Sequence, residues 1–181
     1  MSMRSLIFIA LSVVLTGCAD SHQWMPQQQA LAPLERTQKF YVSTPTDGEY
    51  GTHTYKGSGR NTAQIIRAAL AKEVHSIRLG PETNHFDQAL YAAREAGQDL
   101  LVFPTILHWE DRATEWSMIP DKVEVKIEIV QVQSGDVLSA AIIKGRSGLA
   151  TFGGDHPQDL LPEPVSEFVA GLFHQSPRRA W

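Results

Sequence analysis

The chain has a single cysteine, and its thiol lies where it could act as a nucleophile. Arg4 is the only charge among the first five residues, and residues 6–15 (LIFIALSVVL) form an almost wholly apolar run that ends shortly before Cys18. A basic start, a short apolar run and small residues before a cleavage point are typical of a secretory signal peptide. The run is too short to cross a bilayer, which takes about 20 apolar residues as a helix. We therefore predict that residues 1–17 are removed on export.

Leu15, Thr16, Gly17 and Cys18 resemble the lipobox of bacterial lipoproteins. The resemblance implies that the Cys18 thiol receives a diacylglycerol through a thioether, that the signal is cut between Gly17 and Cys18, and that the new amine is acylated. One acyl chain alone binds a membrane marginally, whereas three make the anchor permanent. Ala19 in place of Asp favours the periplasmic face of the outer membrane over the inner membrane. The alternative is an incidental cysteine in an ordinary signal peptide.

A second group of candidates lies in the Gly-rich segment 48–61. Backbone N–H groups at the start of a helix attract anions, and two cationic side chains flank this one. The segment contains neither GxxxxGK[ST] nor GxGxxG, so an ordinary strand-to-helix loop is the favoured interpretation. A hydrolase would use Ser58, the serine between two glycines, but the GxSxG pattern is missing there. The candidate ligand-binding residues are Lys56, Gly57, Ser58, Gly59 and Arg60.

The sequence predicts no metal site and no cofactor. No two of the seven histidines are three or four residues apart, and one cysteine excludes a Cys-based zinc or iron–sulfur site and an intrachain disulfide. Asp155 and His156 could meet Glu110 and Asp111 in space as metal ligands. Asp155 is more simply a cap before a proline, and Glu110 and Asp111 a solvated strand end.

Two tryptophans are candidates for contact with a partner protein. Trp109 and Trp116 flank several charged residues, and Trp and Arg are favoured at binding hot spots. The alternative is that Trp109 packs in the core and that Trp116 covers a sheet edge.

The composition is that of one folded domain. The 181 residues are 43% hydrophobic and 20% charged, with a formal net charge of −4. This balance argues against a disordered chain and against a general nucleic-acid binder, which needs a basic face. We predict a signal peptide over 1–17, the lipidated cysteine with a flexible tether over 18–37, a periplasmic globular domain over 38–176, and a tail over 177–181.

The patterning predicts a single α/β domain in the order β-α-β-α-β-β-β-α, with helices packed on a mixed sheet. Strands are expected at 40–42, 76–79, 100–103 continuing after a bend at Pro104 to 109, 122–129 and 137–143. Lys122, Glu124, Lys126 and Glu128 should line a wet face, and 133–136 should form a turn. Helices are expected from Asn61 or Thr62, from Asn84 to Gly97, and over Val165, Phe168, Val169 and Leu172. No regular structure is expected over 45–59.

Three segments carry a resemblance that covers nearly the whole mature chain. Residues 55–62 (YKGSGRNT), 102–111 (VFPTILHWED) and 153–157 (GGDHP) are similar to a family of uncharacterised proteobacterial lipoproteins, which is defined by a domain of unknown function. The element order and the hairpin at 130–138 also resemble the TolB amino-terminal domain, the periplasmic part of the curli secretion channel, and lipoprotein activators of peptidoglycan synthases. This looser likeness implies an envelope adaptor.

The function expected from these features is that of a non-enzymatic, membrane-anchored lipoprotein that binds an envelope protein. It would have no catalytic residues and no nucleic-acid partner. The alternative is a periplasmic lipoprotein that binds a small ligand or an anion with the loop 48–61.

Overall fold

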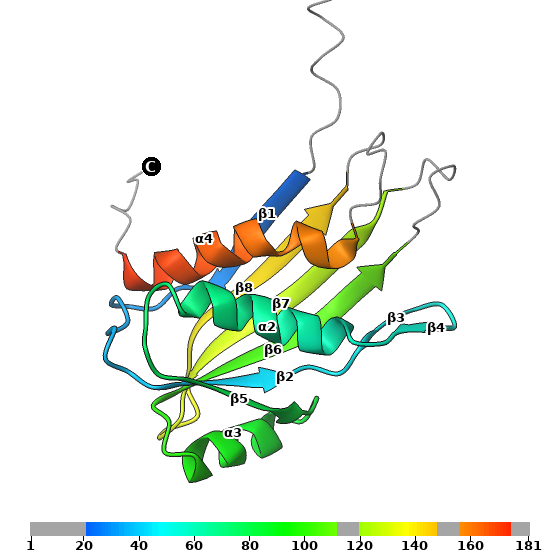
Figure 1. Cartoon of the computed structure of the whole chain (residues 1–181). Helices are drawn as coiled ribbons and strands as arrows, with labels where there is room; N and C mark the ends of the chain where they lie inside the picture. The colour runs from blue at the N-terminus through cyan, green and yellow to red at the C-terminus, as the bar shows by residue number, and fades with distance from the viewer. Residues whose placement is uncertain (1–20, 112–119, 148–155, 175–181) are drawn as a thin grey trace, which may run out of the picture.

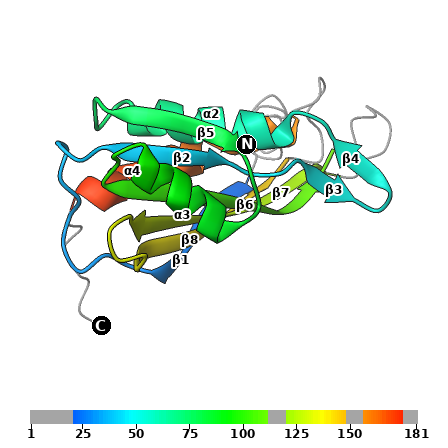
Figure 2. The same cartoon turned by 90° about the horizontal axis from the view of Figure 1, so that it is seen from below.

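Six strands form a mixed sheet with helices on both of its faces, as Figures 1 and 2 show. The computed structural model describes residues 21–111, 120–147 and 156–174. The strands of the sheet lie in the order β1-β8-β7-β6-β2-β5, and β3 and β4 form a separate hairpin. The elements are β1 (Ser21–Gln28), β2 (Phe40–Thr44), β3 (Gly48–Tyr50), β4 (His53–Tyr55), α2 (Ser58–Leu70), β5 (Ile77–Glu82), α3 (Phe86–Glu95), β6 (Leu100–Glu110), β7 (Lys122–Gln131), β8 (Val137–Arg146), the 3-10 turn η1 (Pro157–Leu160) and α4 (Pro162–Phe173).

The predicted fold class and element order are confirmed, with added strands. β2 pairs in parallel with both β5 and β6, and the chain reaches these two neighbours through α2 and α3. Parallel strands covered on both faces read as continuous apolar runs, as Phe40–Val42 and Leu100–Phe103 do. β6, β7 and β8 continue the sheet in antiparallel order.

β7 shows the alternation that the sequence predicts. Its odd-numbered residues from Val123 to Ile129 are buried, while its lysines and glutamates are partly exposed on the other face. Such alternation places successive side chains on opposite faces of a strand. The turn into β8 contains Gly135 at φ 84°, a left-handed conformation that glycine adopts without steric penalty.

The helices divide the core into two clusters. α2 and α4 pack on one face of the sheet, where Phe40, Leu100 and Phe168 belong to the larger cluster. α3 packs on the opposite face, where Leu90 meets Tyr41 and Leu101 in a smaller cluster. In the described part of the chain, α3 is the helix on that face, and it contacts β5 and β6. The charged face of β7 therefore stays open to solvent.

The prediction of a flexible tether over 18–37 is wrong for residues 21–28, and the folded domain begins before residue 38. These residues form β1, which pairs antiparallel with β8 from Ser21↔Arg146 to Gln28↔Ala140. β8 offers a free edge for this pairing, and Trp24 of β1 packs on Phe168 of α4 at 5.9 Å between ring centroids. Pro26 is tolerated because β1 is an edge strand and needs no second hydrogen-bonded neighbour.

Residues 45–59 also contain regular structure that the glycines obscure. β3 and β4 form a short hairpin that turns at Gly51, with φ 60°. A Cβ on Gly48 would lie 2.5 Å from the Cβ of Trp109, so glycine here lets the hairpin approach β6 closely. The predicted start of the next helix at Asn61 or Thr62 is too late, since α2 begins at Ser58.

Two smaller predictions also need correction. β6 continues as one strand through Pro104 to Glu110, and its irregularity lies after the proline, where its register with β7 shifts between Ile106 and His108. The parallel pairing of β6 with β2 ends at Val102. Pro104 lacks an N–H group, but it lies beyond this pairing and so removes no hydrogen bond between β6 and β2. The residue that caps α3 is His85 and not Asn84.

Candidate functional site

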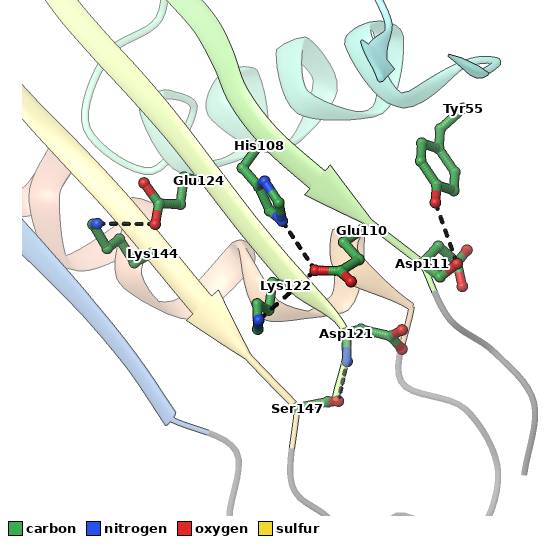
Figure 3. A network of polar contacts seen from close by, with 9 residues as sticks. All are labelled: Tyr55, His108, Glu110, Asp111, Asp121, Lys122, Glu124, Lys144 and Ser147. Carbon is green, nitrogen blue, oxygen red and sulfur yellow. Dashed lines mark hydrogen bonds and ion pairs between the residues drawn. The ribbon is translucent and has the colours of Figure 1, made fainter. Parts of the chain in front are cut away.

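Four strands of the sheet have their ends at one place. Glu110 at the end of β6 is in register with Lys122 at the start of β7, and Lys122 with Arg146 at the end of β8. Arg146 in turn pairs with Ser21, the first residue of β1. Figure 3 shows the side chains that gather at this end of the sheet. We call them the strand-end network: Tyr55, His108, Glu110, Asp111, Asp121, Lys122, Glu124, Lys144 and Ser147.

Glu110 lies at the centre of this network (Figure 3). Its side chain is 3% exposed, with Oε2 at 3.1 Å from His108 Nε2 and at 3.8 Å from Lys122 Nζ. A buried carboxylate is costly unless it is paired and hydrogen-bonded. His108, two residues earlier on β6, and Lys122, opposite Glu110 on β7, are the partners that offset this cost. The prediction of a solvated strand end is therefore wrong for Glu110.

Further polar contacts fasten the strand ends. Lys144 Nζ lies 2.9 Å from Glu124 Oε1 across β7 and β8, where the two residues are directly opposite. Asp121 N donates to Ser147 Oγ at 2.8 Å, and Ser147 N donates to the Asp121 carbonyl at 3.1 Å. This reciprocal pair closes the end of the β7–β8 ladder.

Asp111 and His156 meet in space, as the sequence suggested. His156 Nδ1 lies 3.2 Å from Asp111 Oδ2, and Tyr55 Oη donates to the Asp111 carbonyl at 3.3 Å. These contacts join β4 and the start of η1 to the end of β6. Asp155 lies outside the described residues. Within the described ranges, the set that brings three metal-ligand atoms together lies elsewhere, on β1 and α4.

The start of α2 already holds a carboxylate. Asp47 accepts hydrogen bonds from Gly57 N at 3.0 Å and from Gly59 N at 2.9 Å. These N–H groups are the ones that an anion would need, and a bound anion would meet the charge of Asp47. Lys56 and Arg60 are exposed beside this cap. The geometry therefore does not favour an anion site in the loop 48–61.

Ser58 is not placed as a nucleophile. Ser58 is only 3% exposed, and its Oγ accepts a hydrogen bond from Gly48 N at 2.8 Å. Asp47 Oδ1 accepts from Ser58 Oγ at 3.5 Å, but a nucleophile must also reach a substrate, and the burial of Ser58 prevents this. Ser58 instead ties β3 to the start of α2.

Trp109 is buried and presents no surface to a partner. It is 2% exposed and belongs to the larger core cluster, which is the core interpretation of this residue. Trp116 lies outside the described residues, as do Gly17 and Cys18.

Sequence reasoning missed three residues that the structure makes important. Asp47 and Tyr55 lay in a segment expected to be irregular, and His22 lay in the expected tether. The available signal for β1 was weak: His22 and Trp24 alternate with the polar residues Ser21 and Gln23, but Met25 breaks the alternation.

A protein-family model for a domain of unknown function, DUF4823, matches residues 32–172. The chain belongs to the DUF4823 family. This confirms the resemblance to a family defined by a domain of unknown function. The curated proteins contain no significant match to the chain.

Solved structures share the DUF4823 fold at low sequence identity. The PelC dodecamer from Paraburkholderia phytofirmans has a TM-score of 0.64 and 14% identity, over 87% of this chain and 100% of that one. Protein XCC0632 from Xanthomonas campestris has a TM-score of 0.51 and 9% identity, over 81% and 89% of the two chains. Lipoprotein GNA1162 from Neisseria meningitidis has a TM-score of 0.50 and 14% identity, over 74% and 99%. At these identities the likeness shows the fold alone.

In residues 21–111, 120–147 and 156–174, no helix has both the length and the apolar character that a membrane crossing requires.

Proposed function

We propose that the protein is a lipid-anchored module of the bacterial envelope that acts by binding other proteins and not as an enzyme. One observation carries this proposal: only two residues separate Cys18 from Ser21, where the sheet begins. An extended chain spans at most about 3.6 Å per residue, so this connection reaches roughly 11 Å. A lipid on Cys18 would therefore hold the sheet directly against the bilayer surface.

The short connection also gives the domain an orientation. Ser21 is in register with Arg146, Lys122 and Glu110 across four strands. The strand-end network would then face the membrane, and the β7–β8 turn at the other end of the sheet would face away from it. In a domain oriented in this way the plane of the sheet stands roughly perpendicular to the membrane, so its open face points sideways, where a neighbouring protein can reach it.

One structural neighbour supports an assembly role, and another supports the lipid anchor. The PelC structure is a dodecamer, and GNA1162 is a lipoprotein. A shared fold raises the expectation of a shared role but does not carry function from one protein to another. The partner proposed here is an envelope protein or further copies of this chain. Ala19 supports the outer membrane as the site of the anchor, and the likenesses to TolB and to the curli channel remain predictions.

The anchor is tested by comparing wild type with Cys18→Ser and Thr16→Ser in cells. Wild type should enter the membrane fraction, incorporate labelled palmitate and begin at residue 18. Cys18→Ser should incorporate no label, whereas Thr16→Ser keeps a small residue before the cut and should behave as wild type. A wild-type chain that begins at residue 18 and carries no lipid would refute the anchor.

The binding role is tested separately, by crosslinking the tagged protein in cells and identifying the captured proteins by mass spectrometry. Recurrent capture of one envelope protein, or of multimers of the chain itself, is the expected result. Capture of abundant bystanders alone, by a protein confirmed to carry lipid, would refute the binding role and leave the anchor standing.

A further inference from the structure

Three side chains with metal-binding atoms connect the first strand of the sheet to its last helix. His22 of β1 and Glu163 and Glu167 of α4 each offer one ligand atom, and these atoms all lie within 4.8 Å of one another. They come from opposite ends of the sequence and belong to none of the contacts of the strand-end network. We propose that His22, Glu163 and Glu167 form a zinc-binding site.

The backbone positions of the three ligands are fixed by packing. Glu163 and Glu167 are four residues apart, so they lie on the same face of α4, one turn from each other. Trp24 lies two residues after His22, on the same face of β1, and its ring contacts Phe168, the neighbour of Glu167. This core contact holds β1 against α4 at the ligands. A metal site needs such rigid support to be selective.

The strand beside β1 has a glycine opposite His22. His22 is in register with Gly145 of β8, which has no side chain. A Cβ on Gly145 would lie 2.6 Å from the Cβ of Leu160, the last residue of η1, so η1 packs directly on the backbone of β8 there. Because α4 begins two residues after Leu160, this close approach fixes the start of α4 near the β8 residue that is opposite His22.

Without a metal ion, His22 and Glu163 make only a loose contact. His22 Nε2 lies 3.7 Å from Glu163 Oε2, which is longer than a hydrogen bond. Two glutamates four residues apart on a helix repel each other. The ion pairs formed among the described residues include none with Glu167. A divalent cation between the three groups would remove this repulsion.

The ligand types favour zinc. Imidazole nitrogen suits zinc and other late transition metals, whereas Ca²⁺ and Mg²⁺ prefer oxygen alone. Zinc binds nitrogen and carboxylate oxygen at about 2.0–2.2 Å, so ligand atoms in a tetrahedron are roughly 3.4 Å apart. The glutamates are exposed, and small rotations of their side chains would close the present separations to that value. Three protein ligands leave the fourth position to water.

The test is zinc titration of the full-length chain, purified in detergent and freed of metal with a chelator. We expect calorimetry to show one zinc ion per chain at this site. Zinc at about 100 times its Kd should raise Tm by roughly 5–11 °C, because a ligand that binds only the folded state stabilises it by mass action. Mutation of a residue that only orients a metal ligand weakens metal binding about 10–100-fold. His22 and Glu167 are proposed as ligands themselves, so His22→Ala and Glu167→Gln should each weaken zinc binding at least tenfold.

Matched controls separate this site from adventitious binding. His75→Ala and Glu95→Gln change an exposed histidine and an exposed helical glutamate elsewhere, and both should bind zinc as wild type does. Glu167→Gln alters only an exposed side chain, so it remains informative if His22→Ala does not fold. The proposal is overturned if wild type binds no zinc, if it prefers Ca²⁺, or if His22→Ala and Glu167→Gln bind zinc with wild-type affinity.

Discussion

Replacement of Asp47 by alanine should remove the cap of α2. The carboxylate accepts hydrogen bonds from the N–H groups of Gly57 and Gly59, at 3.0 and 2.9 Å. Loss of a helix N-cap costs about 0.5–2 kcal/mol, and hydrogen bonds to charged groups are worth about 1.5–3 kcal/mol. Since Asp47 is partly buried, we expect Asp47→Ala to lower the free energy of unfolding by about 2 kcal/mol, which corresponds to a fall in Tm of roughly 4–8 °C.

The assay is thermal and urea unfolding followed by circular dichroism, with Asp87→Ala as the matched control. Asp87 lies in the first turn of α3, is exposed, and makes no capping hydrogen bond. Its removal should cost less than about 1 kcal/mol, the value of a carboxylate near a helix N-terminus. Equal losses for the two variants would refute the capping role of Asp47.

The same variant tests the loop 48–61 as an anion site. In Asp47→Ala the N–H groups of Gly57 and Gly59 lose their carboxylate partner, so added phosphate should raise the Tm of this variant more than that of wild type. Phosphate also stabilises folded proteins in general, and the comparison is therefore made at one phosphate concentration. If wild type gains as much as the variant, and Lys56→Ala abolishes the gain, the loop binds anions in spite of Asp47.

Four further substitutions test the packing and the buried tyrosine. Gly59→Ala should lower the free energy of unfolding by at least about 2 kcal/mol, because the new Cβ would lie 2.1 Å from the Pro45 carbonyl oxygen. The control is Gly171→Ala, where a Cβ would have nothing within 4 Å and should stabilise α4 by about 0.5–1 kcal/mol. Equal urea midpoints for the two variants would contradict the crowding at Gly59. Trp109→Ala should lower the free energy of unfolding by about 3–5 kcal/mol, and a loss under 1 kcal/mol (about a third of the lower bound) would mean that the cavity collapses. Burial raises the pKa of Tyr41 above its ordinary value of 10.0, so the folded state favours the neutral phenol. The contribution of Tyr41 to the free energy of unfolding is present below pH 10.0 and is lost as the pH rises through the folded-state pKa. Wild type should therefore lose stability at high pH more steeply than Tyr41→Phe. Parallel profiles of stability against pH for the two proteins would refute this.

The sequence was sufficient for the elements whose burial has a clear period. β7 alternates strictly, and α4 places Val165, Phe168, Val169 and Leu172 on one buried face. Local patterning dictates such elements because each half-buried face must be apolar.

What the sequence could not supply depends on distant partners. β1 has little apolar alternation of its own and is a strand because β8, near the other end of the chain, has a free edge. β3 and β4 are three residues each, too short for a period to be visible. The cap of α2 comes from Asp47 across a hairpin, whereas capping rules look to the residue just before the helix. The proposed zinc ligands likewise lie on two segments that only the folded sheet brings together.

The place of β1 in the sheet has a consequence for how the protein acquires its structure. If the chain is exported as proposed above, β1 is the first of the described elements to cross the inner membrane, whereas its hydrogen-bonding partner β8 is the last strand of the sheet to follow. Closing so long a stretch of chain is slow, because its entropy is lost before the contact is gained. Under the proposed function, lipid attachment and signal cleavage at Cys18 would take place while β1 is still unpaired, and β1 would join the sheet after β8 has been exported.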